Sequence, residues 1–395
     1  MKSFIRFAGM AALLAAFVAI GSTVGYAQNC EDYDGNAALD AKIRESYPKD
    51  ATLKVAVESG KQYLEKYGSC EVFKDFSDWL KVQVPKWEER VKFLEAAAWL
   101  KERFARFDNS VKSQNYDDAF AAGGEIIAKY PVGQTDKLTG FNSIDQAVTL
   151  GLIGLPASYS KNFKNNDQSL KYANIAIAEL KAGGKATKQD KDKNDVFGIF
   201  QFERSRQDAI SELTYTIGFI KYWDKGDKKG GLASFYETSQ LPGSFKSQPA
   251  LYATIGEYYR DEALKITEDI RKMIKDLEAA TTDEEKLRID GLIKGKEALF
   301  NGYAERAMDA YGRAHSLSQS TTPDQKKYKD ALYATISGLY ELRFQKKDGV
   351  NTWLSSAVAK PMPNPTTEVE PIKDPEPTTT TTTTSTTGAS AVSRP

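Results

Sequence analysis

The stretch that decides the fold runs Gly295-Lys-Glu-Ala-Leu-Phe-Asn-Gly302-Tyr-Ala-Glu-Arg-Ala307-Met-Asp-Ala-Tyr311-Gly-Arg-Ala314. Small residues recur at Gly295, Ala307 and Ala314, and Tyr311 stands one helical turn from both alanines. Small side chains let two helix axes come close, and the tyrosine fills the space beside them. Since glycine is a poor helix former, Gly302 is expected to break the run. The stretch therefore predicts two short antiparallel helices that meet at Gly302.

Two further segments have the same character. Residues 114–119, followed by Tyr130-Pro131, predict a second helix of such a pair, with Ala119 at the close contact. Residues 165–176 predict another, with Ala173 and Ala176 in the packing positions. A weaker candidate surrounds Gly231. Helix pairs therefore recur along the chain.

These segments resemble the tetratricopeptide repeat (TPR), a helix–turn–helix unit with a period of 34 residues. The chain also resembles uncharacterised exported TPR-like proteins of bacteria. The resemblance implies an all-α solenoid, in which each antiparallel helix pair hides its apolar face against the next pair. The best unit departs from the family at Lys294, Ala298 and Gln319. The array is predicted to be degenerate, because spacings of 50, 62 and 76 residues separate the anchors Ala119, Ser169, Gly231 and Ala307.

The composition divides the chain into three parts. Residues 28–359 show helical spacing of apolar residues and form the predicted repeat domain, with a subdivision near 182–200 as the alternative. Residues 360–395 hold 7 of the 14 prolines and an unbroken threonine run at 378–384. Such a segment buries too little apolar surface to offset its ordering entropy, so we expect a disordered tail. The tail is expected to be either a plain solubilising segment or a glycosylated stalk.

The first 27 residues have the pattern of a signal peptide. Lys2 and Arg6 precede an apolar run at 7–20, and Gly25-Tyr26-Ala27 places small residues at the cleavage positions. That run is short for a bilayer, which needs about 20 residues. Cleavage before Gln28 would leave 52 basic and 54 acidic residues. We therefore expect a periplasmic or secreted protein with no membrane span and no nucleic-acid partner, because nucleic-acid binding normally needs a basic surplus.

The two cysteines, Cys30 and Cys70, lie near the predicted mature N-terminus. An exported chain meets oxidising conditions, so we expect one disulfide between them. A free thiol or a metal site is the alternative. Two cysteines and a single histidine, His315, are poor material for a thiolate zinc site. We therefore predict no bound metal and no cofactor.

The chain shows no pattern of a known catalytic site. It has no Gly-Xaa-Ser-Xaa-Gly elbow, no phosphate-binding loop and no zinc-protease motif. The single histidine is explained by a position near a helix C-terminus. The acidic segment 190–195 lacks the glycine and the closing glutamate of a calcium loop. An enzyme is therefore only the third hypothesis.

The favoured function is a non-catalytic binding or scaffold protein that presents a TPR-like groove to a peptide or protein partner. In that family, the first helix of each pair contributes the groove side chains. The candidates here are Lys294, Glu297, Asn301, Tyr252 and Tyr333. The rival hypothesis is a glycan-binding protein of the cell envelope, because exposed tryptophan and tyrosine rings beside polar loops can hold sugars. The chain carries 20 Tyr, 19 Phe and 5 Trp.

Overall fold

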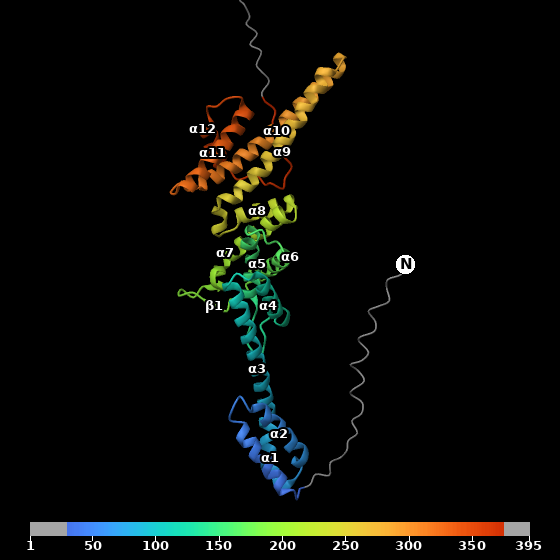
Figure 1. The fold of residues 1–395 in the computed structure, drawn as a ribbon, viewed down its shortest axis with the longest axis vertical. Helices are drawn as coiled ribbons and strands as arrows, with labels where there is room; N and C mark the ends of the chain where they lie inside the picture. The colour runs from blue at the N-terminus through green and yellow to red at the C-terminus, as the bar shows by residue number, and fades with distance from the viewer. Residues whose placement is uncertain (1–29, 375–395) are drawn as a thin grey trace, which may run out of the picture. The chain divides into compact units, whose positions relative to one another are not determined.

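The computed structural model describes residues 30–374, and this part of the chain is all-α, as predicted (Figure 1). The predicted signal peptide and residues 375–395 of the predicted tail lie outside the described residues. The chain divides into two compact units. Unit 1 comprises residues up to 103 together with 137–140, and unit 2 comprises residues 104–136 and 141 onward. The region of the alternative subdivision, near 182–200, falls inside unit 2. None of the described helices is both long enough and apolar enough to cross a bilayer.

Unit 1 is a small helical unit around one apolar core. Its elements are α1 (Tyr33–Ser46), α2 (Leu53–Tyr67), the 3-10 turn η1 (Glu71–Phe73) and the first part of α3 (Lys74–Lys112). Fully or almost fully buried side chains from all three α-helices, including Ile43, Tyr63 and Leu80, meet in this core. The predicted disulfide is confirmed, since Cys30 and Cys70 are bonded and fasten the segment before α1 to the end of α2.

The start of α1 is held by a polar cluster. The Asp32 carboxylate accepts a hydrogen bond from the backbone N–H of Gly35, which is the usual helix N-cap arrangement. The buried Tyr67 hydroxyl also donates to Asp32, at 2.6 Å. These two hydrogen bonds hold the pKa of Asp32 below its ordinary value of 3.8, and the bond from Tyr67 has the larger effect. The same contact and burial raise the pKa of Tyr67 to about 12.

Unit 2 begins with helices packed around a central one. Helix α5 (Ile144–Tyr159) is buried on nearly every side, because its sequence is apolar all round rather than on one stripe. Helix α6 (Asn166–Lys181) approaches it closely at Gly151, where a Cβ atom would lie 2.9 Å from the Cα of Ala173. Ala119 on α4 (Tyr116–Lys129), Ala173 and Ala176 are fully buried.

A small antiparallel sheet interrupts the helices. It contains β1 (Lys188–Gln189), β2 (Asp195–Phe197) and β3 (Arg204–Ser205), in that order. In its register Lys188 pairs with Val196, and Val196 with Ser205. The sheet is anchored to the core, because Phe197 is fully buried and Asp145 of α5 accepts hydrogen bonds from the N–H groups of Thr187 and Gly198.

The rest of unit 2 is a run of helices, of which α9 and α10 are long and lie side by side (Figure 1). A second core cluster joins them to α7, α8, α11 and α12. The remaining elements are η2 (Phe200–Phe202), α7 (Arg206–Phe219), the π-helix η3 (Ile220–Asp224), α8 (Lys228–Gln240), η4 (Ser244–Ser247), α9 (Pro249–Ala279), α10 (Asp283–Leu317), α11 (Pro323–Phe344) and α12 (Val350–Val358).

The predicted break at Gly302 does not occur, because α10 continues through it as one helix. A Cβ atom at Gly302 would lie 2.3 Å from the backbone oxygen of Glu370. The glycine therefore makes room for another part of the chain and does not end a helix. Gly295 has open space around it, whereas Tyr311 packs its ring on Gly256 of α9. Ala307 and Ala314 are fully buried. Both lie on the continuous helix α10, so they are not on the second helix of the hairpin that the sequence predicted.

Candidate functional site

Residues 360–374, which we call the C-terminal strap, lie against α10 (Figure 1). The sequence placed them in the disordered tail, and the structure differs here. The strap has no helix or strand, yet Met362, Pro365 and Val369 are buried at spacings of three and four residues. Proline in the extended backbone reduces the entropy lost on ordering. The burial of these three side chains thus holds the strap in place, although its composition is typical of a disordered tail.

Arg306 of α10 is the main polar anchor of the strap. Its guanidinium donates to the backbone oxygens of Asn364 at 3.3 Å, Thr367 at 3.2 Å and Glu368 at 2.9 Å. It also donates to the hydroxyl of Tyr259. A planar, always charged donor can hold several carbonyl oxygens at once, and hydrogen bonds from a charged group are stronger than neutral ones. One side chain therefore fixes the bend of the strap.

The last part of the strap is fixed at three further points. Asn301 donates from Nδ2 to the oxygen of Ile372 at 3.0 Å, and the Ile372 N–H donates to the oxygen of Ala298 at 2.7 Å. The buried Arg343 of α11 pairs with both Glu305 at 2.9 Å and Asp374 at 2.6 Å. Between these anchors, Gly302 lets the strap backbone touch α10. The strap is thus a fixed wall of the fold.

The strap, α12 and α10 line an open pocket of about 370 Å³. Its apolar walls are Trp353 and Ala357 of α12 with Pro361, Pro363 and Ile372 of the strap. This volume falls at the lower end of the range for small-ligand sites, about 300–1,000 Å³. An apolar wall with a few converging polar groups is the usual composition of a ligand site. The pocket is therefore the candidate functional site of unit 2.

Charged groups converge on the pocket from the helix and from the strap. Glu305, Arg306 and Asp309 line it from α10, whereas Lys360 and Glu370 line it from the strap side. Asp309 is only 7% exposed, and burial raises its pKa, while Arg313 opposes that rise through two hydrogen bonds of 3.0 Å. Glu305 and Asp309 are each paired with an arginine, so neither carboxylate is placed as an uncommitted general acid or base.

The groove residues that we predicted from the sequence do not form one surface. Lys294 and Glu297 are exposed on α10, and Lys294 pairs with Asp290. Tyr252 is almost fully buried and donates to the oxygen of Lys246. Tyr333 is half-buried, donates to Asn351 and contacts the His315 ring at 5.6 Å. Only Asn301 lies at the strap.

Sequence reasoning missed Arg306, Asp309, Arg343, Trp353 and the strap. The single available signal was the spacing of Met362, Pro365 and Val369, which places apolar residues at regular intervals in a polar segment. The arginines gave no signal, because a charged residue on a helix is usually a solvated one.

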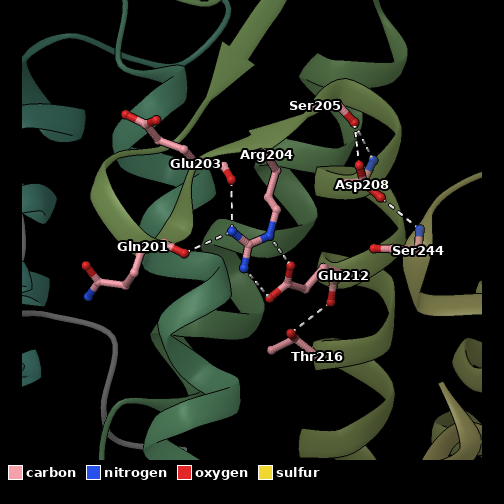
Figure 2. A network of polar contacts seen from close by, with 8 residues as sticks. All are labelled: Gln201, Glu203, Arg204, Ser205, Asp208, Glu212, Thr216 and Ser244. Carbon is pink, nitrogen blue, oxygen red and sulfur yellow. Dashed lines mark hydrogen bonds and ion pairs between the residues drawn. The ribbon is translucent and has the colours of Figure 1, made fainter. Parts of the chain in front are cut away.

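Figure 2 shows a second polar network, around Arg204. The arginine forms an ion pair with the buried Glu212 of α7 through Nε and Nη2 and donates from Nη1 to the oxygens of Gln201 and Glu203. Nearby, Asp208 accepts from the hydroxyl of Ser205 and from the N–H of Ser244. All three guanidinium nitrogens are used within the network. It therefore fastens η2, β3 and η4 to α7, and we assign it a structural role.

Unit 1 carries a half-exposed aromatic surface. Tyr47 is 37% and Trp79 is 36% exposed, and their rings lie 5.7 Å apart. Trp87 contacts both rings at 5.5 Å. The Asp50–Arg90 ion pair, at 2.8 Å, follows Tyr47 and Trp87 closely in sequence. We call Tyr47, Trp79 and Trp87 the aromatic cluster.

Comparison with known proteins gives no assignment: the chain matches no protein-family model, no curated protein and no solved structure. Within residues 30–374, no group of three or more His, Cys, Asp or Glu side chains is arranged to hold a metal ion.

Proposed function

We propose that this chain is an exported, non-catalytic binding protein that captures a short peptide segment of a protein partner in the pocket on α10. The observation that carries the proposal is the pocket itself, which is lined by apolar and charged side chains together. Its strap wall is held by Arg306, Asn301 and Arg343. A wall fixed in advance lowers the entropy lost on binding.

The chemistry of the pocket favours binding over catalysis. The two α10 carboxylates that line it are committed to arginines, and no cysteine, serine–histidine pair or histidine lines it. The disulfide of unit 1 supports export, since disulfides persist in oxidising compartments.

We also propose a distant relation to helical repeat proteins for the pairs α5–α6 and α7–α8. Small residues at their contacts support it. A Cβ atom at Gly231 would lie 3.0 Å from the backbone oxygen of Gly218, and Ala173 is equally close to Gly151.

The test is a screen of short synthetic peptides against the chain from residue 28 to 395, followed by calorimetric titration of those that bind. Trp353→Ala should weaken binding at least tenfold, because it removes the largest apolar wall. Trp223→Ala is the matched control, since this exposed tryptophan of unit 2 does not line the pocket. Binding that Trp353→Ala leaves unchanged would place the peptide site elsewhere.

The aromatic cluster supports glycan binding as a second candidate function. Sugar rings stack on exposed aromatic faces, and planar carboxylates and guanidinium groups bind their hydroxyls. Trp79 and the Asp50–Arg90 pair provide these groups in unit 1. A glycan array should show binding that Trp79→Ala removes and Trp353→Ala leaves intact. An array with no signal would reject this candidate.

A further inference from the structure

We propose that unit 2 carries a binding site for an uncharged sugar, centred on Trp223 of the π-helix η3. This site lies outside the pocket on α10 and outside the aromatic cluster of unit 1. The inference goes beyond the proposed peptide function, and it does not depend on the glycan candidate of unit 1.

Three aromatic rings, which we call the aromatic row, lie in contact at the surface of unit 2. Tyr159 at the end of α5 contacts Phe219 of α7 at 5.0 Å between ring centroids, and Phe219 contacts Trp223 at 6.4 Å. The two outer side chains are well exposed, at 59% for Tyr159 and 48% for Trp223. The core therefore leaves both outer rings accessible to a ligand.

The backbone at Trp223 is irregular. In η3 the N–H of Lys225 donates to the oxygen of Ile220 at 3.0 Å, five residues back along the chain. Such π-helical turns are rare, and they are frequently found at functional sites. Here the turn keeps Ile220 and Tyr222 buried, whereas Trp223 and its neighbour Asp224 reach solvent.

A buried polar network holds Asp224 next to the aromatic row. Its Oδ2 atom accepts a hydrogen bond from Nδ2 of Asn166 at 3.2 Å, and Asn166 is bonded in turn to Ser158, the residue before Tyr159. Both Asn166 and Ser158 are buried. The carboxylate is therefore oriented before a ligand arrives, so its ordering does not oppose binding.

Two hydrogen-bonding atoms at this site have no partner among residues 30–374. Oδ1 of Asp224 accepts no hydrogen bond, and the indole N–H of Trp223 donates none. The first is an acceptor and the second a donor. Hydroxyl groups can serve both atoms, and the C–H face of a ligand can lie on an exposed aromatic ring. A sugar combines these two properties.

The charges of the turn offset one another. Lys225 pairs with Asp224 at 3.2 Å and with Asp167 at 2.7 Å. Lys221 of the same turn supplies a second positive charge. Two cations thus stand against two acids and give no preference to a charged ligand, which is why we assign the site to an uncharged sugar.

The test follows the tryptophan indole N–H signals of residues 28–395 by NMR while sugars are added. The signal of Trp223 is assigned from Trp223→Ala, in which it disappears. The uncharged probes are cellotriose, maltotriose and triacetylchitotriose, and the charged probes are trigalacturonate and chitotriose. At least one uncharged probe should shift the Trp223 signal, and it should do so at a lower concentration than either charged probe.

Two substitutions test the contacts while Trp223 remains as the reporter. Tyr159→Ala should weaken binding of the active probe about tenfold, as is usual when a central aromatic contact is truncated. Asp224→Asn should weaken it about two- to fivefold, because an amide oxygen is a weaker acceptor than a carboxylate. Tyr33→Ala, which removes an equally exposed tyrosine from unit 1, is the matched control. Thermal melting followed by circular dichroism shows that each variant is folded.

The outcomes separate this inference from the proposed function. If no uncharged probe shifts the Trp223 signal, the inference is wrong, and peptide binding in the pocket is unaffected by that result. Sugar-induced shifts confined to Trp79 would support the glycan candidate of unit 1 and equally reject a site at Trp223. If only a charged probe shifts Trp223, the assignment to an uncharged ligand is wrong. A folded Tyr159→Ala that binds as tightly as the unchanged chain would show that the aromatic row is not the site.

Discussion

The sharpest test of the strap is a pair of glycine substitutions in α10. Alanine is favoured over glycine in a helix interior by about 1 kcal/mol. Gly295 has no atom within 4 Å of a built Cβ, so Gly295→Ala should raise the free energy of unfolding by about 0.5–1 kcal/mol. At Gly302 the same Cβ would lie 2.3 Å from the Glu370 oxygen and 2.9 Å from Val369 Cγ1. The strap must move, and overpacking of this kind costs about 1–3 kcal/mol.

The intrinsic helix gain is common to the two variants, so it cancels in the comparison. Gly302→Ala should be less stable than Gly295→Ala by the clash alone, about 1–3 kcal/mol. Urea unfolding followed by circular dichroism measures this difference. Hydrogen exchange locates it, and should be faster in residues 360–374 of Gly302→Ala only. Equal stabilisation by both alanines, with no change in exchange, would show that the strap does not touch α10 at Gly302.

Three further predictions concern the anchors of each unit. Arg306→Met should expose the strap to proteolysis and lower the free energy of unfolding by about 2–3 kcal/mol, because hydrogen bonds from a charged donor are lost; an unchanged digestion pattern would contradict this. Replacing Cys30 and Cys70 by serine should cost unit 1 about 3–4 kcal/mol in the chain-entropy model, and melting in the presence and absence of reductant checks it. The stability from Asp32 should be present above pH 3.8 and lost as pH falls through its lowered pKa. In Tyr67→Phe the NMR titration of Asp32 should move up toward 3.8, and an unmoved titration would show that the tyrosine is not the cause.

The helical class and several packing residues could be predicted from the sequence. Ala119, Ala173 and Ala307 were expected at close helix contacts, and each is fully buried. The disulfide followed from two cysteines in a chain with a predicted signal peptide. These predictions succeeded because small residues at helical spacing and paired cysteines have local signatures.

The site could not be predicted in the same way. In the sequence Gly302 predicts a helix break, because glycine lowers the stability of the helix turn around it. Its role in the structure is to make room for the backbone of Glu370, which lies 68 positions further along the chain. Arg306 looks like a solvated charge, and its acceptors are strap oxygens that any residue type would provide. Backbone acceptors leave no trace in side-chain patterns.

The amino-acid sequence alone determined that the chain is helical, that Cys30 and Cys70 pair, and where apolar faces recur, because these depend on neighbours within one or two turns or on the only available partner. Only the tertiary structure decided that α10 is continuous, that residues 360–374 lie on it, and that Arg306 and Lys360 reach one pocket. Those features depend on the burial of Met362 and Val369 against a helix that is distant in the sequence. This burial must offset the conformational entropy that the strap loses on ordering, and only the folded structure provides the surface for it.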